Sequence, residues 1–189
     1  MGSLKFRSQK NKNPANKAKK LRAILFMTTT ERIRSLPPEA TWTHHFDFDV
    51  QIFDTDCFGV MWHGAYLKWM ELGRCKLLNN MGVTIDVPGQ ANGHVYPVAE
   101  QNLQFKHKAP YAEPLRLTTV LTVRGFKMEF EQIFRSRYPE RMDQVTLQSK
   151  TTVLVLDSDW KIQRRLPAFL LDALQDNIDK PTAAPDTIG

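Results

Sequence analysis

The stretch of this sequence that decides the fold covers residues 53–71 and reads FDTDCFGVMWHGAYLKWME. Its first part is rich in Asp, Thr and Gly, which favour turns. From Tyr66 onward, apolar side chains recur at three- and four-residue steps, the spacing of one face of a helix. The stretch therefore predicts a turn that leads into a helix over Gly64–Asn80, with Gly82 as a C-terminal cap.

On both sides of this stretch the sequence has the two-residue period of β-strands. Before it, the apolar residues Phe46, Phe48, Val50 and Ile52 alternate with polar ones. After it, a loop with Gly and Pro over residues 87–93 precedes four alternating runs. These runs lie at about residues 95–108, 115–126, 128–138 and 145–156, and a short helix is predicted at 167–174. Short links between the runs favour antiparallel pairing.

This order of one strand, one long helix and a four-stranded meander is an α+β arrangement. The helix has to cover one face of the sheet so that both can bury their apolar sides. The other face would still carry Val153 and Val155, or Leu154 and Leu156 if the register shifts by one residue. An uncovered apolar face predicts a partner subunit, so we expect a homo-oligomer, either a dimer or a tetramer.

The charge of the chain is unevenly distributed. Lys and Arg number 26 and Asp and Glu number 20, a formal net charge of +6. Residues 1–30 hold eight basic residues and no acidic one, so the remainder carries 18 basic and 20 acidic residues. Because the basic excess belongs to a tail, we expect the folded body to bind no nucleic acid. We predict a basic, disordered extension over residues 1–40, a folded domain over 41–175 and a flexible tail over 176–189.

Several other classes of protein are disfavoured. No apolar run approaches the roughly 20 residues that span a bilayer, so we expect no membrane span. Two cysteines, Cys57 and Cys75, make no disulfide framework, and the five histidines lack the Cys or acidic spacing of a metal site. The basic start is not followed by the apolar core of a signal peptide. A reducing compartment, the cytoplasm, is the expected location.

The segment from Asp54 to Glu71 resembles the hotdog-fold thioesterases of the 4-hydroxybenzoyl-CoA thioesterase type, which include acyl-CoA thioesterases of the Tol-Pal operon. The resemblance rests on an Asp-x-Asp pair that ends at Asp56, a Gly-containing turn at Gly59, and His63 seven residues past the second Asp. It extends over about residues 43–174. It implies a hotdog fold, in which a curved antiparallel sheet of five or six strands wraps a long central helix.

The resemblance also implies catalytic roles. In that family the second Asp of the motif is catalytic, which assigns the role to Asp56. This carboxylate would be either the nucleophile on the thioester carbonyl or the general base for water, and both remain open. The family polarises the carbonyl with a backbone N–H at the helix start, here that of His63, whose imidazole could also position substrate or water. Apart from the family, Asp56 could simply be a turn or capping residue, and Asp54 is expected to be structural.

The resemblance suggests substrate contacts as well. It places Phe58, Trp62 and Tyr66 along the substrate pocket. It also implies that basic residues on one hairpin turn hold the phosphates of coenzyme A, and the matching positions are Arg124 and Lys127. Basic residues on such a turn are about as often merely solvated.

The chain departs from the family pattern at three places. A small residue is replaced by Phe58, an Asn by Ala65, and a Gly-Asp pair by Ala112-Glu113. Because Phe58 and Ala65 lie close to the expected pocket, the acyl specificity of a relative does not carry over.

The function that the resemblance implies is hydrolysis of an acyl thioester to the free acid and the thiol. The thiol would be coenzyme A or the phosphopantetheine of an acyl carrier protein, bound as part of the substrate, and no separate cofactor is expected. The alternative is a non-catalytic acyl-thioester-binding hotdog protein whose basic N-terminal arm contacts DNA or a partner. A hotdog dehydratase would need a different arrangement of His and acid on the helix.

Overall fold

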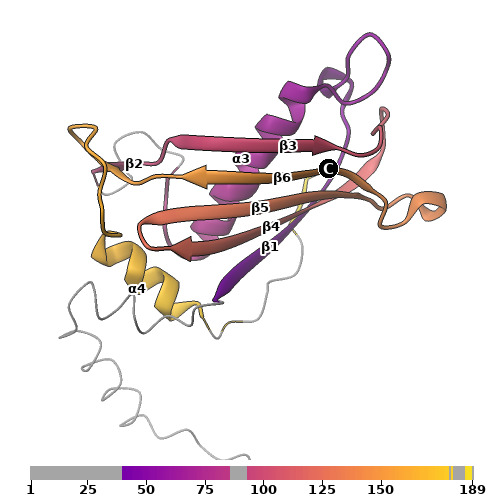
Figure 1. Cartoon of the computed structure of the whole chain (residues 1–189). Helices are drawn as coiled ribbons and strands as arrows, with labels where there is room; N and C mark the ends of the chain where they lie inside the picture. The colour runs from indigo at the N-terminus through magenta and orange to yellow at the C-terminus, as the bar shows by residue number, and fades with distance from the viewer. Residues whose placement is uncertain (1–39, 86–92, 179, 181–185, 189) are drawn as a thin grey trace, which may run out of the picture.

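A computed structural model describes residues 40–85, 93–178, 180 and 186–188 of the chain (Figure 1). The main sheet has the strand order β3-β6-β5-β4-β1-β8. Its strands are β1 (Thr41–Asp49), β3 (Val98–Phe105), β4 (Pro114–Arg124), β5 (Lys127–Ser136), β6 (Val145–Val153) and β8 (Asp186–Ile188). The first five pair antiparallel, and β8 pairs parallel with β1. Nearly all of the predicted basic extension, and most of the loop at 87–93, lie outside the described residues.

The four predicted alternating runs correspond to β3, β4, β5 and β6. The first run begins later than predicted, because His94–Val95 form a separate short strand, β2, which pairs with β7 (Leu156–Asp157). The predicted first strand also ends early, at Asp49. Its last predicted residue, Ile52, is 67% exposed and starts the 3-10 helix η1 (Ile52–Asp54). A second 3-10 helix, η2, covers Pro139–Arg141.

The long helix is α3 (His63–Asn80), one residue longer at its start than predicted. It lies against one face of the sheet (Figure 1), with Ala65, Tyr66, Trp69, Met70 and Leu77 among its buried residues. The helix approaches the sheet closely at Gly73, where an added Cβ would stand 2.7 Å from the Leu117 side chain on β4. The helix ends at Asn80, and Gly82 follows in the capping turn as predicted, with a φ of +81° that suits glycine.

The buried apolar side chains form two clusters, one towards each end of the sheet. The first cluster includes Trp42, Leu121 and Phe130 together with three leucines of the short helix α4 (Ala168–Asp176). The second is rich in aromatic residues, among them Phe46, Phe48, Tyr66, Trp69 and Phe134. Figure 1 shows that α4 lies near the end of the sheet where β4 turns into β5.

Two expectations are wrong in the structure. Val153 and Val155 are 3% and 0% exposed because they pack in the first cluster beneath α4, so they provide no argument for a partner subunit. The C-terminal tail was expected to be flexible, but Asp186–Ile188 adds to the sheet as β8. Asp186 is also tied to the helix, since its carboxylate accepts a hydrogen bond from Lys76 Nζ at 3.1 Å. In the described residues, no helix is long and apolar enough to cross a bilayer.

Candidate active site

The segment between β1 and α3 forms a small hairpin, which we call the Asp56 hairpin (residues 54–62). Trp62 N donates to Asp54 O at 3.0 Å, and Asp56 N donates to Val60 O at 3.0 Å. The tip is a tight turn closed by a 3.0 Å bond from Gly59 N to Asp56 O. Gly59 has a φ of +69°, which explains the need for glycine there. Asp56 is therefore paired across the hairpin with Val60, which lies three residues before His63, the first residue of the helix.

Asp54 fixes this hairpin to α3. Its side chain is 1% exposed and accepts hydrogen bonds from Lys68 Nζ and, at 3.0 Å, from Trp69 Nε1. The Lys68 ammonium also lies 4.7 Å from the centre of the Phe53 ring. A buried carboxylate with two helix donors is a structural group, as the sequence suggests for this residue.

Asp56 is exposed at the hairpin tip. Its Oδ1 accepts a hydrogen bond from Phe58 N at 2.8 Å and a longer one, 3.5 Å, from Val60 N. Among the described residues nothing bonds to Oδ2. One oxygen therefore shapes the turn, as the alternative interpretation requires, while the other is available to a substrate or a water molecule. Within the residues that the structure describes, no apolar wall covers this carboxylate.

The first turn of α3 is also open. His63 is the first helical residue, and its N–H has no acceptor among the described residues, as expected for the start of a helix. The imidazole is exposed and contacts the Trp62 ring edge to face, with ring centres 5.4 Å apart. The Trp62 ring lies over Gly64, where a Cβ would stand 2.1 Å from it. Glycine thus makes room for the indole beside the open N–H.

An open groove of about 310 Å³ runs from this hairpin to the end of β3. Its apolar lining is Val60, Met61, Tyr66 and Phe105. Its remaining lining is basic and consists of Lys106, His107 and Lys108. Tyr66 is 2% exposed and makes edge-to-face contacts with Phe105 and Phe134. Burial raises the pKa of the Tyr66 hydroxyl, so this part of the groove stays neutral.

The predicted site residues are only partly brought together. Asp56, Gly59 and His63 share the hairpin and the helix start, with Phe58 and Trp62 exposed beside them and Tyr66 in the groove. Arg124 and Lys127 pair with each other at the β4–β5 turn, at the opposite end of the sheet. In addition, Arg124 is bonded to Glu129 at 3.0 Å. A single chain does not place this turn beside Asp56.

Sequence reasoning missed the basic segment Lys106–Lys108. The signal available was a Lys-His-Lys run directly after a predicted strand, but such a run is usually a solvated loop. Only the backbone path, which brings Ala109 O to 2.8 Å from Met61 N, shows that it borders the Asp56 hairpin.

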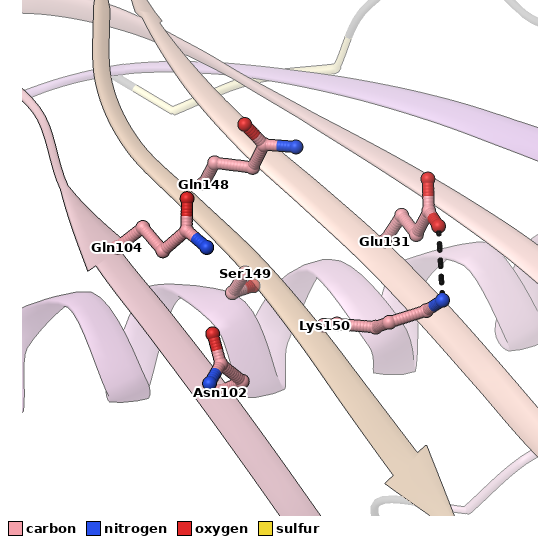
Figure 2. A pocket seen from close by; sticks show the side chains of 6 residues that line it. All are labelled: Asn102, Gln104, Glu131, Gln148, Ser149 and Lys150. Atoms are coloured by element: carbon pink, nitrogen blue, oxygen red, sulfur yellow. Dashed lines mark ion pairs between the residues drawn. The ribbon is translucent and has the colours of Figure 1, made fainter.

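A second hollow, of about 300 Å³, lies on the outer side of the sheet. Figure 2 shows Asn102, Gln104 and Gln148 projecting from the strands on the side away from α3. Lys150 and Glu131 form a 3.6 Å ion pair there. All six lining residues have polar or charged side chains, so this hollow suits an acyl chain less well than the groove does and is not the candidate site.

The departure at Ala112-Glu113 has a structural consequence next to the hairpin. Ala112 has a φ of +59°, a left-handed conformation that glycine adopts more easily. The Glu113 carboxylate is buried, at 1% exposure, and accepts hydrogen bonds from Ser136 Oγ and Arg141 Nη2. Glu113 therefore anchors the start of β4.

Known proteins resemble the chain at the sequence level. Residues 50–186 match the thioesterase-like superfamily. A Synechocystis protein provisionally named an esterase is 30% identical over 133 residues, which cover 66% of this chain and 74% of that protein. A Bacillus subtilis protein provisionally named an acyl-CoA thioesterase is 30% identical over 82 residues. That second match covers 43% of this chain, and the chain spans 59% of the relative's length.

Solved structures show the same fold. A 1,4-dihydroxy-2-naphthoyl-CoA thioesterase from Synechocystis aligns with a TM-score of 0.63 and 15% identity, covering 75% of this chain and 99% of that one. The 4-hydroxybenzoyl-CoA thioesterase from Pseudomonas aligns with a TM-score of 0.60 and 16% identity, covering 70% and 99%. These matches confirm the hotdog prediction in its coarser form, five antiparallel strands with a helix on one face.

The family match covers well over half of the chain and includes the Asp56 hairpin, the groove and strands β3 to β6, whereas β1 lies just before the matched residues. It confirms the resemblance that the segment from Asp54 to Glu71 indicates. The chain belongs to the thioesterase-like superfamily.

Proposed function

We propose that the protein is an acyl thioesterase, which uses water to split an acyl-CoA or acyl-carrier-protein thioester into the free acid and the thiol. The observation that carries this proposal is the Asp56 carboxylate, which has one unbonded oxygen on a hairpin that leads directly into the open N–H of α3. Family membership and the names of the sequence relatives support the same activity.

In this mechanism the thioester carbonyl oxygen accepts a hydrogen bond from His63 N–H, which stabilises the negative charge that develops there. Asp56 then either attacks the carbonyl carbon, forming an anhydride that water hydrolyses, or removes a proton from the attacking water. In both routes the sulfur leaves with the electrons of the C–S bond and takes up a proton. Gly59 holds the turn that presents Asp56.

We also propose that the active form is a homo-oligomer, a dimer or a tetramer. Phe53 and Phe58 are 70% and 84% exposed beside Asp56, and the edge strand β3 carries exposed Val98 and Phe105. A second copy would bury such surface, give the acyl group a second wall, and complete a sheet that wraps α3. It is also the way in which Arg124 and Lys127 could reach a substrate held at Asp56. The proposed location is the cytoplasm.

The direct test is a panel of acyl-CoA and acyl-carrier-protein thioesters assayed with a thiol-trapping dye. Asp56→Asn should lower kcat by at least ~10²-fold, the usual size of a general acid–base or nucleophilic contribution. Asp49→Asn, at the exposed end of β1, is the matched control and should keep full activity. Thermal unfolding of both variants verifies that they are folded.

Two outcomes would contradict the proposal. A fully active Asp56→Asn variant would remove the catalytic role of this residue. Measurable thioester binding without turnover of any panel member would instead support the non-catalytic alternative. His63→Ala should be milder than Asp56→Asn because the backbone N–H remains, and an equal loss would indicate chemistry by the imidazole.

A further inference from the structure

The segment that follows β3 is held in place at both of its ends. We call it the strap (residues 106–108). Lys106 N and His107 N donate to Thr146 O at 2.9 and 3.2 Å, which fixes the strap to the start of β6. Immediately after it, Ala109 O accepts from Met61 N at 2.8 Å, which fixes the chain to the Asp56 hairpin. The strap therefore has a defined path along one side of the groove.

The groove combines an apolar floor with a basic side. Met61 and Tyr66 in its lining are 5% and 2% exposed, and Tyr66 packs against two phenylalanines, so this part is rigid. The ionisable groups of the lining are the Tyr66 hydroxyl, whose raised pKa keeps it neutral, and the three side chains of the strap. No carboxylate of the described residues lines the groove.

The two strap lysines have no ion-pair partner in the part of the chain that the structure describes. Among the described residues no carboxylate lies within 4 Å of either ammonium, and Lys106 Nζ donates only to Gln104 Oε1 at 2.9 Å. Two other surface lysines do have acidic partners, Lys150 with Glu131 at 3.6 Å and Lys161 with Asp159 at 3.7 Å. Two unneutralised cations beside an apolar cleft raise the local concentration of an anion that also has an apolar part.

We infer that the strap binds an anionic group of the thioester substrate through Lys106 and Lys108 while the apolar part of the same molecule lies in the groove. This inference rests on the proposed function for the identity of the ligand. The anion is either a phosphate of coenzyme A or a carboxylate on the acyl group, since a lysine ammonium is a point charge that pairs with both. The strap would serve the Asp56 of its own chain, unlike the Arg124–Lys127 turn.

The test measures equilibrium binding, which needs no turnover. Three probes separate the sources of the anion. They are coenzyme A, pantetheine, which lacks the phosphates together with the adenosine, and succinyl-pantetheine, which adds an acyl group that ends in a carboxylate. The proteins are wild type, Lys106→Gln/Lys108→Gln, and two controls, Arg124→Gln/Lys127→Gln and Lys150→Gln. Binding is measured by calorimetry at two salt concentrations, since lost ion pairs also reduce the salt dependence.

The strap variant should bind coenzyme A, succinyl-pantetheine or both at least ~10-fold more weakly than wild type, because two charge-assisted contacts are removed. Its affinity for pantetheine should be unchanged. A loss confined to coenzyme A identifies phosphate as the anion, and a loss confined to succinyl-pantetheine identifies carboxylate. The Lys150→Gln control should behave as wild type with all three probes.

Three results would overturn the inference. They are unchanged affinity of the strap variant for both anionic probes, an equal loss for pantetheine, and a loss for coenzyme A seen only in the Arg124→Gln/Lys127→Gln control. The proposed function fails separately, through absence of thioester turnover by wild type. A strap-dependent affinity for coenzyme A in a protein without turnover would keep the binding site and remove the hydrolase activity.

Discussion

The two ends of the sheet differ in how well their apolar side chains are covered. Where β4 turns into β5, α4 packs Leu170, Leu171 and Leu174 against the sheet, and all three are at most 1% exposed. At the other end, β1 leads through the single turn η1 into the Asp56 hairpin. Phe53 and Phe58 remain 70% and 84% exposed there.

This difference separates stability from function along one sheet. Apolar surface left in water forgoes about 25 cal/mol per Å², so an end lined with exposed aromatic side chains gives up folding free energy. The same end carries the unbonded Asp56 oxygen, the open N–H of His63 and the unneutralised strap lysines. A carboxylate oxygen, a backbone N–H and lysine ammonium groups without partners at one end indicate a surface that binds ligands. The end that α4 covers, which we call the closed end, serves instead as a scaffold.

The largest predicted effect tests the closed end. Leu170→Ala should lower the free energy of unfolding by about 2–5 kcal/mol, because it leaves a cavity beneath α4. Phe58→Ala at the open end should change it by no more than about 0.5 kcal/mol, as expected for an exposed side chain. Urea unfolding of both variants checks this. Similar losses in the free energy of unfolding at the two sites would contradict this difference between the two ends.

The second prediction concerns Gly73, where α3 approaches the sheet closely. In an exposed helix, Gly→Ala would add up to about 1 kcal/mol of stability. Here the new Cβ would meet Leu117 at 2.7 Å and Thr119 Oγ1 at 2.8 Å, so Gly73→Ala should destabilise by about 1–3 kcal/mol.

A double-mutant cycle provides the control for this prediction. Leu117→Val shortens the side chain that an alanine at position 73 would meet, so the double variant should lose less stability than the sum of the single ones. A stabilising effect of Gly73→Ala would contradict the close contact between the helix and the sheet at this position.

The two ends also differ in how much of them the sequence predicts. Alternation of apolar residues identifies β3, β4, β5 and β6, and the three- and four-residue spacing identifies α3, because these periods depend only on which side chains are buried. These periods do not show which segment of the protein covers an apolar face. Val153 and Val155 were therefore assigned to a partner subunit, whereas α4 of the same chain covers them.

The candidate site was predictable where its residues are contiguous. Asp56, Gly59 and His63 lie within one turn and helix start, so a local motif places them together. The hairpin bonds between backbone groups, the strap and the three-residue strand β8 leave no periodic signal. The ends of the 11-residue strand β4 lie roughly 33 Å apart, which separates Arg124 from Asp56 in one chain.

The third prediction concerns how stability depends on pH through His44, which lies on β1 near the end of α3 and near β8. His44 is 2% exposed, and burial lowers the pKa of its imidazole below 6.5, an effect that the nearby Lys76 and His45 reinforce and Asp186 opposes. The unfolded state then binds more protons than the folded state as the pH falls below 6.5. Acidification from pH 7 to 5 should therefore destabilise the protein through this residue.

Thermal unfolding at pH 5, 6 and 7 checks the sign. His44→Gln keeps a polar partner for Asn80, which lies 3.2 Å from the imidazole Nδ1, and it should reduce the dependence of Tm on pH in this range. The comparison is the slope with pH, not the absolute stability of the variant. An unchanged slope would show that His44 titrates alike in the folded and unfolded states.

The smallest predicted effect is a gain in stability at the open end. Ala112 adopts a φ of +59°, a left-handed conformation that costs about 1–2 kcal/mol for a residue with a Cβ. Ala112→Gly removes this cost but adds freedom to the unfolded chain, so the net gain should be about 0.5–1 kcal/mol, which raises Tm by roughly 1–4 °C in a protein of this size. Gly59→Ala provides the matched opposite, because Gly59 has a φ of +69° and open space around an added Cβ. Gly59→Ala should lower the free energy of unfolding by a similar amount. A gain at position 112 with a loss at position 59 would locate the strain of the open end in its backbone. A loss in both variants would instead show that side-chain packing around Ala112 matters more than its backbone conformation.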